Sequence, residues 1–403
     1  MYSPKIIEAN LDRIQKGTRK KYTRYSREES VGRSQQLELK RGNGKAFSDE
    51  DRTFMENEQV LSQIDFRYFC ERYAYINIDA SMGGGIGPLV LWEPQEWLVQ
   101  KLAAKEEEMY EQKARNEPID GIMVVSNKIR QIGFTAIWRA ITWHRLITGN
   151  HLRAFGVSLD DDLKHELYER DRFIYDNLPF FLKPEVVFDV KDEHISLENN
   201  SRIIYDASTK KGALGISRQF EITHLTEVSQ WERWATNRIQ LDLLPGIPQS
   251  LSTVFGMEAV PAGRGNFWHE FSEDVRMGKY PRWIYTFIPW YAEPRKYRRT
   301  PPVGWQPSEA SMAHAYKISE TSSLYTRWSN YMVPKDNLYW WETTREEFRL
   351  SGNLNFFLTN FAANPEESFQ HAGRSAFPTE YLEWARNQTV DGTAYEIAGP
   401  SGN

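Results

Sequence analysis

One apolar run, the polar loop after it and the helical pattern that follows constrain the fold of this chain more than any other segment. Residues 121–126 read Gly-Ile-Met-Val-Val-Ser, a composition typical of a buried strand. Residues 127–135 read Asn-Lys-Ile-Arg-Gln-Ile-Gly-Phe-Thr, and a helical pattern begins at Ala136. A strand that enters a helix through a short loop creates an anion site, because the first N–H groups of the helix have no partner within it.

The spacing in this loop is that of a phosphate-binding P-loop in which one residue has moved. When the pattern G-x-x-x-x-G-K-[ST] is laid on it with Thr135 as the hydroxyl, Gly133 falls on the second glycine. Phe134 stands where the lysine belongs, and Lys128 stands at the first glycine. We interpret this as a lysine displaced to the start of the loop, so that a cation, backbone N–H groups and a magnesium-binding hydroxyl are all present.

This interpretation defines a set of ATP-binding residues. We expect Lys128 to contact the β- and γ-phosphates and Thr135 to coordinate Mg²⁺, with Arg130 as the next candidate for the cation. The other residues expected on the nucleotide are Gln131, Ile132, Gly133 and Phe134.

Between residues 121 and 290, short apolar runs alternate with helical patterns. The expected strands are 121–126, 152–158, 202–207, 219–225, 250–256 and 282–288, and the expected helices are 134–148, 160–177, 231–243 and 266–277. Such alternation predicts an α/β fold with a mainly parallel, twisted sheet flanked by helices. Ligands of such sheets bind at the carboxyl ends of the strands, where residues 128–135 lie.

A second strand ends in a carboxylate about ninety residues after the loop, at Leu225-Thr226-Glu227. In P-loop ATPases, one strand-end acid positions Mg²⁺ and a neighbouring glutamate polarises the attacking water. Thr226 stands in the first place, where it can hydrogen-bond a metal-bound water, and Glu227 stands in the second, as the expected base. The alternative is a solvated glutamate at the start of a loop.

Two weaker signals flank this pair. Gln95 follows Pro94 at a helix start, and its amide offers the donor and acceptor that would read adenine; the alternative is a surface glutamine. Arg264 lies in a glycine-rich loop, 263–265, and Arg218 lies in another loop; either is a candidate arginine finger, although most loop arginines are simply solvated. The glycines at 83–85 precede a strand-like segment, so they indicate a hairpin rather than a second phosphate loop.

Composition excludes several classes of protein. The 403 residues contain one cysteine, Cys70, which excludes an internal disulfide framework and fits a reducing compartment. No apolar run approaches the ~20 residues that span a bilayer, so no membrane association is expected. The net charge of −5 argues against a uniformly basic nucleic-acid binder.

The N-terminal part differs from the rest in charge. Residues 1–50 carry twelve Lys and Arg against seven Asp and Glu, and residues 19–27 interleave cations with tyrosines. We expect residues 1–55 to be a basic, loosely ordered segment, either a solvated tail or a contact for DNA phosphates. Residues 56–300 are expected to form the ATPase core, and 301–381 a small, mostly helical lid or linker subdomain.

Together these motifs resemble the ATPase half of the large terminase of tailed phages, over about residues 64–381. The displaced lysine and the Thr226-Glu227 pair both fall within the variation of that family. The segments that carry the resemblance, in chain order, are Phe66-Arg67-Tyr68-Phe69, Glu93-Pro94-Gln95, residues 128–135, Leu225-Thr226-Glu227-Val228-Ser229-Gln230-Trp231, Gly263-Arg264-Gly265-Asn266-Phe267-Trp268, Phe287-Ile288-Pro289-Trp290-Tyr291, and Asn364-Pro365-Glu366-Glu367-Ser368-Phe369 leading to Gly373 and Phe377.

The resemblance implies a P-loop ATPase of the additional-strand type that drives double-stranded DNA into a procapsid in the host cytoplasm. It implies catalytic roles for Glu227, Lys128 and Arg264, ATP and Mg²⁺ as cofactors, and a portal protein, a procapsid and a small terminase subunit as partners. It also implies a monomer in isolation that forms a ring, by analogy a pentamer, when assembled.

Two departures from the family pattern leave alternatives open. First, residues 259–262 read Ala-Val-Pro-Ala, where hydroxyl-bearing residues are typical of the family. Second, residues 382–403 read as the start of a linker toward a nuclease domain that would lie outside this chain or on a separate one. The alternatives are a non-hydrolysing DNA or capsid-assembly adaptor on a decayed ATPase fold, and a helicase-like ATPase.

Overall fold

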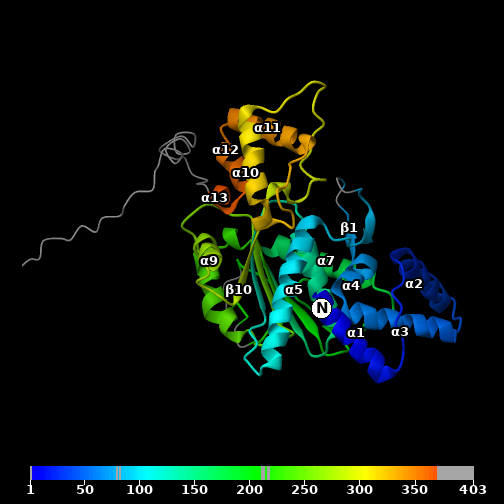
Figure 1. The fold of residues 1–403 in the computed structure, drawn as a ribbon. Helices are drawn as coiled ribbons and strands as arrows, with labels where there is room; N and C mark the ends of the chain where they lie inside the picture. The colour runs from blue at the N-terminus through cyan, green and yellow to red at the C-terminus, as the bar shows by residue number, and fades with distance from the viewer. Residues whose placement is uncertain (1, 79, 81–82, 210–213, 216–217, 370–403) are drawn as a thin grey trace, which may run out of the picture.

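An eight-stranded sheet forms the centre of the computed structural model, which describes residues 2–78, 80, 83–209, 214–215 and 218–369 (Figure 1). Along the sheet the strands run in the order β10-β3-β9-β8-β4-β7-β6-β5. The first six are parallel to one another, and β6 and β5 continue the sheet in antiparallel pairing. Their bounds are β3 (Ile122–Lys128), β4 (Arg153–Ser158), β5 (Val186–Val190), β6 (His194–Leu197), β7 (Arg202–Ala207), β8 (Ile222–Thr226), β9 (Val254–Ala259) and β10 (Trp283–Ile288).

The strand order identifies the kind of α/β fold. β9 lies between β3, which leads into the phosphate-type loop, and β8, which leads to the expected acid pair. A strand inserted at this place is the defining feature of the additional-strand class of P-loop folds, so the expected fold class is confirmed. β9 begins four residues later than the expected 250–256, and this shift brings Glu258 into the sheet.

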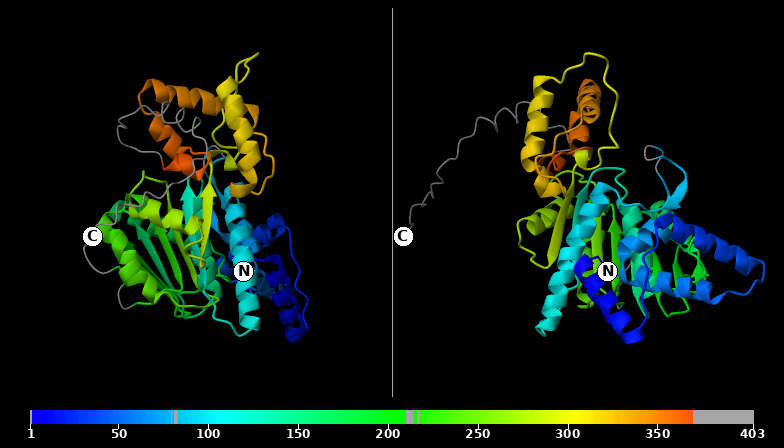
Figure 2. Two further views of the ribbon diagram at one scale, coloured as in Figure 1. Left: turned by 60° about the vertical axis from the view of Figure 1, so that its left-hand side comes forward. Right: turned by 45° about the vertical axis from the view of Figure 1, so that its right-hand side comes forward.

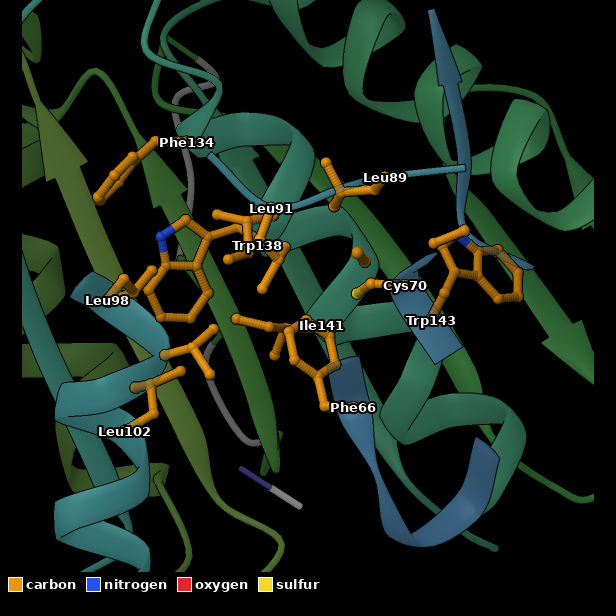
Figure 3. Close-up of a cluster of buried hydrophobic side chains, with 14 of the residues drawn as sticks. Phe66, Cys70, Leu89, Leu91, Leu98, Leu102, Phe134, Trp138, Ile141 and Trp143 are labelled. Carbon is orange, nitrogen blue, oxygen red and sulfur yellow. The ribbon is translucent and has the colours of Figure 1, made fainter. Parts of the chain in front are cut away.

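Helices cover both faces of the sheet and explain the apolar character of β3. Ile122 and Val124 pack into one cluster, with α5 (Glu93–Ala114), α6 (Phe134–Thr148) and α7 (Asp161–Asp176). Met123 and Val125 pack into the other, with α8 (Arg233–Arg238) and α9 (Phe267–Arg276). Because side chains alternate between faces along a strand, a strand that is buried on both faces is apolar at successive positions. Figure 3 shows part of the first cluster, around Trp138 and Ile141.

The N-terminal segment differs from the expectation of a loosely ordered tail. It forms α1 (Pro4–Thr18), α2 (Arg27–Gly42) and α3 (Asp49–Ile64), followed by α4 (Phe66–Tyr73), beside the sheet (Figures 1 and 2). The first three helices each begin at a serine whose hydroxyl accepts a backbone N–H: Ser3, Ser26 and Ser48.

The polar composition of residues 1–55 did not indicate this packing, because part of the contact is made by polar side chains. Glu58 of α3 is fully buried and accepts hydrogen bonds from the hydroxyls of Tyr68, at 2.7 Å, and Tyr73. The backbone N–H groups of Tyr2 and Ser3 both donate to Glu106 on α5. These contacts hold the segment against α4 and α5.

The basic stretch 19–27 is partly neutralised by this packing. Lys20 pairs with Glu56 at 2.6 Å, and Arg24 pairs with Asp65 at 2.6 Å. Less of its charge is therefore available to DNA phosphates than the sequence alone indicated.

Beyond the carboxyl end of the sheet stands a helical subdomain (Figures 1 and 2). It contains α10 (Glu309–Tyr325), α11 (Lys335–Leu350), α12 (Leu354–Asn360) and α13 (Pro365–Ser368), and the lid or linker role expected for residues 301–381 stays a prediction. The expectations for residues 370–381 and 382–403, with Gly373 and Phe377, lie outside the described residues. A hairpin of β1 (Tyr75–Asn77) and β2 (Ile86–Pro88) encloses Gly83 to Gly85, as expected. None of the helices in the described ranges has the length and apolar character needed to cross a bilayer.

Gly256 on β9 should tolerate no side chain. A Cβ there would lie 2.3 Å from the indole of Trp138, which is fully buried and has no room to move. We expect Gly256→Ala to destabilise the protein by about 3 kcal/mol, the upper range for overpacking, measured as a loss of thermal midpoint. Gly32 in α2 is the matched control: an added Cβ there would have no neighbour within 4 Å, so Gly32→Ala should stabilise by about 0.5–1 kcal/mol. Equal effects of the two substitutions would contradict this packing.

Acid should destabilise the fold through three neutral histidines. Burial lowers the pKa of His144 and His224, and it lowers the pKa of His314, packed between Trp290 and Trp341, to about 3. Below about pH 6.5 the unfolded chain binds protons that the folded chain does not, so each histidine removes up to about 1.4 kcal/mol of stability per pH unit.

The thermal midpoint should therefore fall steadily between pH 7 and pH 5. His314→Phe should reduce that slope, because the phenyl ring can stack on the same two indoles without titrating. A midpoint that is constant over this range in the unsubstituted chain would refute the assignment.

Candidate active site

A pocket of about 840 Å³ opens where β3 passes into α6. Its wall brings together seven of the residues expected from the sequence: Gln95, Lys128, Gln131, Ile132, Gly133, Phe134 and Thr135. The opposite wall comes from β1 and from α7, with Tyr75, Asn77, His165, Glu169, Arg170 and Phe173 among its residues. The volume suits a nucleotide-sized ligand.

The loop between β3 and α6 is shaped by two residues with left-handed backbone. Gln131 has φ of 52° and Gly133, the N-cap of α6, has φ of 74°. Glycine is needed at 133 on both grounds, because an added Cβ would also lie 2.7 Å from the amide nitrogen of Gln95. The first N–H groups of α6 therefore face the pocket without a carbonyl partner inside the helix.

Gln95 braces this loop. Its side-chain Nε2 donates to the carbonyl oxygen of Gly133 at 2.8 Å, and its Oε1 accepts the N–H of Trp92 at 2.9 Å. A primary amide has two donors and two acceptor lone pairs, so one of each remains for a base edge. The adenine-reading role stays a prediction, and the contact to Gly133 adds a positioning role.

Phe134 occupies the usual lysine position because its ring belongs to the core. The side chain is 2% exposed and lies in the cluster that contains Leu91, Leu98 and Trp138 (Figure 3). The ring of this residue is thus held in the core although the residue also borders the pocket, and a lysine side chain there could not reach a ligand without leaving this cluster.

Lys128, the last residue of β3, lies between two carboxylates. Its ammonium is 2.9 Å from Oε1 of Glu227 and 3.3 Å from Oε2 of Glu258, and its side chain is 8% exposed. Burial favours the neutral amine, but the two carboxylates outweigh burial and raise the pKa of Lys128. The lysine is therefore charged, and it lies where the loop between β3 and α6 begins.

Glu227 and Thr226 stand side by side at the end of β8 but point to different partners. Glu227 has left-handed backbone, with φ of 55°, and its carboxylate, 22% exposed, lies beside Lys128. The Thr226 hydroxyl donates to Oε1 of Glu258 at 2.8 Å. Neither residue lines the pocket that the described residues form, but Glu227 adjoins it through its contact with Lys128.

Glu258 is the residue that the sequence did not single out. It lies on β9, is fully buried, and has its Oε1 within 3.4 Å of the Thr135 hydroxyl and of Nε2 of His224. Burial would raise the pKa of its carboxyl, but the charge of Lys128, with His224 and Thr226 beside it, outweighs burial and lowers that pKa. The only signal in the sequence was an acid inside an apolar run, and the boundary error in β9 concealed it.

Besides Thr226 and Glu227, two further expected residues, Arg130 and Arg264, lie outside the pocket wall. The guanidinium of Arg130 donates to the side-chain oxygen of Asn360 on α12 and lies 5.7 Å from the ring of Phe356. The guanidinium of Arg264 donates to the carbonyl oxygen of Phe369 at 3.0 Å. The pocket wall, as far as the described residues define it, includes neither, so their contacts to ATP stay predictions.

The strand order defines the fold as a P-loop fold of the additional-strand class. Comparisons with protein families and with curated proteins give no match. The solved structures that resemble the chain include the HK97 bacteriophage large terminase, at 12% identity and a TM-score of 0.47, over 74% of this chain and 54% of that one. The chain thus spans about half the length of that terminase.

Two further phage structures are similar over a smaller part. The first is the large terminase of a thermophilic bacteriophage in complex with ADP, at 11% identity and a TM-score of 0.33, over 46% of this chain and 45% of that one. The second is the ATPase domain of the Thermus phage P74-26 large terminase, at 11% identity and a TM-score of 0.30, over 43% of this chain and 78% of that one.

Removing the ammonium of Lys128 should destabilise the protein, because it leaves two carboxylates facing each other without a cation. We expect Lys128→Met to cost about 3–5 kcal/mol, the range for breaking a buried pair. Adding Glu258→Gln to that variant should recover part of the loss, since one of the stranded charges is removed. Denaturant unfolding of the single and double variants measures this, and strictly additive losses would contradict the coupling.

Proposed function

We propose that this chain is an ATP hydrolase and the motor subunit of a phage-type DNA-packaging terminase. One observation carries the hydrolase part: a lysine, a helix N-terminus and a hydroxyl lie in the wall of one nucleotide-sized pocket, and a glutamate at the end of β8 adjoins that pocket through its contact with the lysine. That set matches what phosphoryl transfer needs from a protein, namely positioning and stabilisation of negative charge.

In this proposal the phosphates of ATP lie against the N-terminus of α6. Lys128 moves from its two carboxylates to the β- and γ-phosphates, because a phosphate oxygen offers it more negative charge at the same loop. The transfer frees the Glu227 carboxylate, which accepts a hydrogen bond from the attacking water and orients it toward the γ-phosphorus. A bond forms from the water oxygen to that phosphorus, the bond to the leaving ADP oxygen breaks, and the proton of the water passes to the Glu227 carboxylate.

The oxygen donors beside the loop fit a magnesium ion. The Thr135 hydroxyl would hold it, with the Thr226 hydroxyl in the same cluster, and oxygen ligands are those that Mg²⁺ takes. When bound, Mg²⁺ supplies neutralisation of the charge on the β- and γ-phosphate oxygens.

The motor part of the proposal rests on the motif resemblance. Its partners would be double-stranded DNA, a portal and procapsid, and a small terminase subunit, with the chain forming a ring when assembled. The protein carries net negative charge, so its own affinity for DNA should be low and fall steeply with salt.

Glu227→Gln should separate binding from hydrolysis. The amide keeps the shape of the side chain but has no negative charge and cannot take the proton of the attacking water, so nucleotide affinity should stay within a few-fold while turnover falls by about 10²-fold or more. Phosphate release and fluorescent-nucleotide binding measure the two. Glu232→Gln, five residues on at an exposed position, is the control and should leave both unchanged. Normal turnover in Glu227→Gln would refute the role.

A packaging assay tests the motor role directly. Incubation of the chain with portal-bearing procapsids, its small subunit, a separate nuclease part if one is needed, ATP and linear DNA should render the DNA resistant to added nuclease. Lys128→Ala, which removes the phosphate-binding cation, should abolish this protection. Protection by that variant, or ATP turnover that never protects DNA, would favour a different ATPase role.

A further inference from the structure

We infer that Glu258 supplies the metal-site carboxylate that P-loop ATPases ordinarily carry at the position of Thr226, so that the acid has moved to the neighbouring strand. The inference rests on the proposed function and deepens it. In the usual arrangement one acid at the end of the strand occupied here by β8 holds the magnesium ion together with the loop hydroxyl. Thr226 has no charge with which to do so.

Sheet register places the two residues at the same point. Thr226 and Glu258 are paired across the parallel strands β8 and β9, so their side chains project from the same face of the sheet. Their oxygens are 2.8 Å apart. A carboxylate on β9 at this register therefore reaches nearly the place that an aspartate on β8 would fill.

The same carboxylate adjoins the loop hydroxyl. Oε1 of Glu258 is 3.4 Å from Oγ1 of Thr135, the residue expected to hold Mg²⁺. A hydroxyl and a carboxylate oxygen on adjacent elements are the protein contribution that a phosphate-bound magnesium requires.

The complete burial of Glu258 indicates that this carboxylate has a function, because burying it is costly. A fully buried carboxylate costs several kcal/mol to desolvate, and its one close cation is Lys128 among the residues that the structure describes. Once Lys128 moves to the phosphates, this carboxylate needs another positive charge. A divalent cation at the Thr135 hydroxyl would provide it without leaving the site.

Glu227 and Glu258 differ in what they can reach. Glu227 is 22% exposed at the strand end, whereas Glu258 has no exposed side-chain surface and is held by Thr226. Glu258 is therefore poorly placed to orient the attacking water, and Glu227 is poorly placed to share an ion with Thr135. The two acids divide the two roles that an adjacent acid pair on one strand would perform.

A second layer holds Glu258 in place. Nε2 of His224 lies 3.4 Å from its Oε1, while Nδ1 of His224 lies 3.4 Å from Nη1 of Arg139. Because an arginine can only donate, Nδ1 accepts and Nε2 carries the proton toward Glu258. Arg139 is itself fixed by Asp171 at 2.9 Å. His224 is thus a positioning residue.

The test measures metal dependence of nucleotide binding rather than turnover. Affinity for a fluorescent ADP analogue is measured with Mg²⁺ and with EDTA, and binding of Mn²⁺ in the presence of ADP is followed by electron paramagnetic resonance. In the unsubstituted chain Mg²⁺ should strengthen binding by at least about 10-fold. Glu258→Gln should reduce this gain to about 2-fold or less and remove the bound-Mn²⁺ signal.

The decisive variant returns the acid to its usual strand. Thr226→Asp combined with Glu258→Gln should restore the Mg²⁺ gain, a result that a purely structural role of Glu258 would not give. Glu106→Gln is the matched control: Glu106 is nearly as buried, but it serves the N-terminus, so its loss should lower stability without changing the Mg²⁺ gain.

Three outcomes decide the matter. A full Mg²⁺ gain in folded Glu258→Gln, or a double variant that folds and binds ADP but regains no Mg²⁺ gain, would overturn the inference and leave the proposed hydrolase standing. Absence of nucleotide binding by the unsubstituted chain would overturn the proposed function and this inference with it. Loss in the single variant with recovery in the double variant would establish it.

Discussion

The site depends on one ammonium group held between two carboxylates. Lys128 ends β3, Glu227 follows β8 and Glu258 lies on β9, so their contact fixes three adjacent strands at their carboxyl ends. Burying either acid alone would cost several kcal/mol, and the lysine offsets that cost for both. The same group is the cation that the phosphates of a nucleotide would compete for. Ligand binding in the pocket is therefore coupled to the charge balance at the ends of the strands. A ligand that draws Lys128 away changes the electrostatic surroundings of both acids at once.

Much of this fold could be predicted from periodicity. β7 and α6 begin and end where the pattern placed them, at 202–207 and 134–148, because long apolar runs between polar loops admit few alternatives. The strand–loop–helix at Lys128 also gave the location of the pocket. What failed was local: β9 was placed at 250–256, and Glu258 stayed hidden because an acid inside a strand has meaning only when the facing residue, Thr226, is known. The N-terminal helices were missed because their buried contacts include Glu58 with tyrosine hydroxyls, which a hydropathy argument counts as solvated.

At Phe134 and Arg130, the contacts in the structure differ from the roles that the sequence motif assigns to these positions. The motif places a lysine at 134, but the ring there fills the core and the cation has moved to the start of the loop. Arg130, which the sequence offered as a reserve cation, instead joins the loop to Asn360 on α12, and its backbone carbonyl accepts a hydrogen bond from Tyr297. The loop therefore contacts the helical subdomain directly. In a motor of the proposed kind, such a contact is a route by which the state of the phosphates and the position of the lid would be linked.

Contact between Lys128 and the phosphates is the central claim. An acyl phosphate of ATP transfers its acyl group to a lysine amine held beside the terminal phosphate, and mass spectrometry of the digested protein then identifies that lysine. We predict acylation of Lys128, suppressed by excess ATP and not by AMP, which lacks the β- and γ-phosphates. Lys296, whose ammonium lies 5.5 Å from the ring of Trp92 near the same pocket, is the internal comparison. ATP-protected labelling of Lys296 with Lys128 unmodified, or labelling that ATP does not suppress, would contradict the claim.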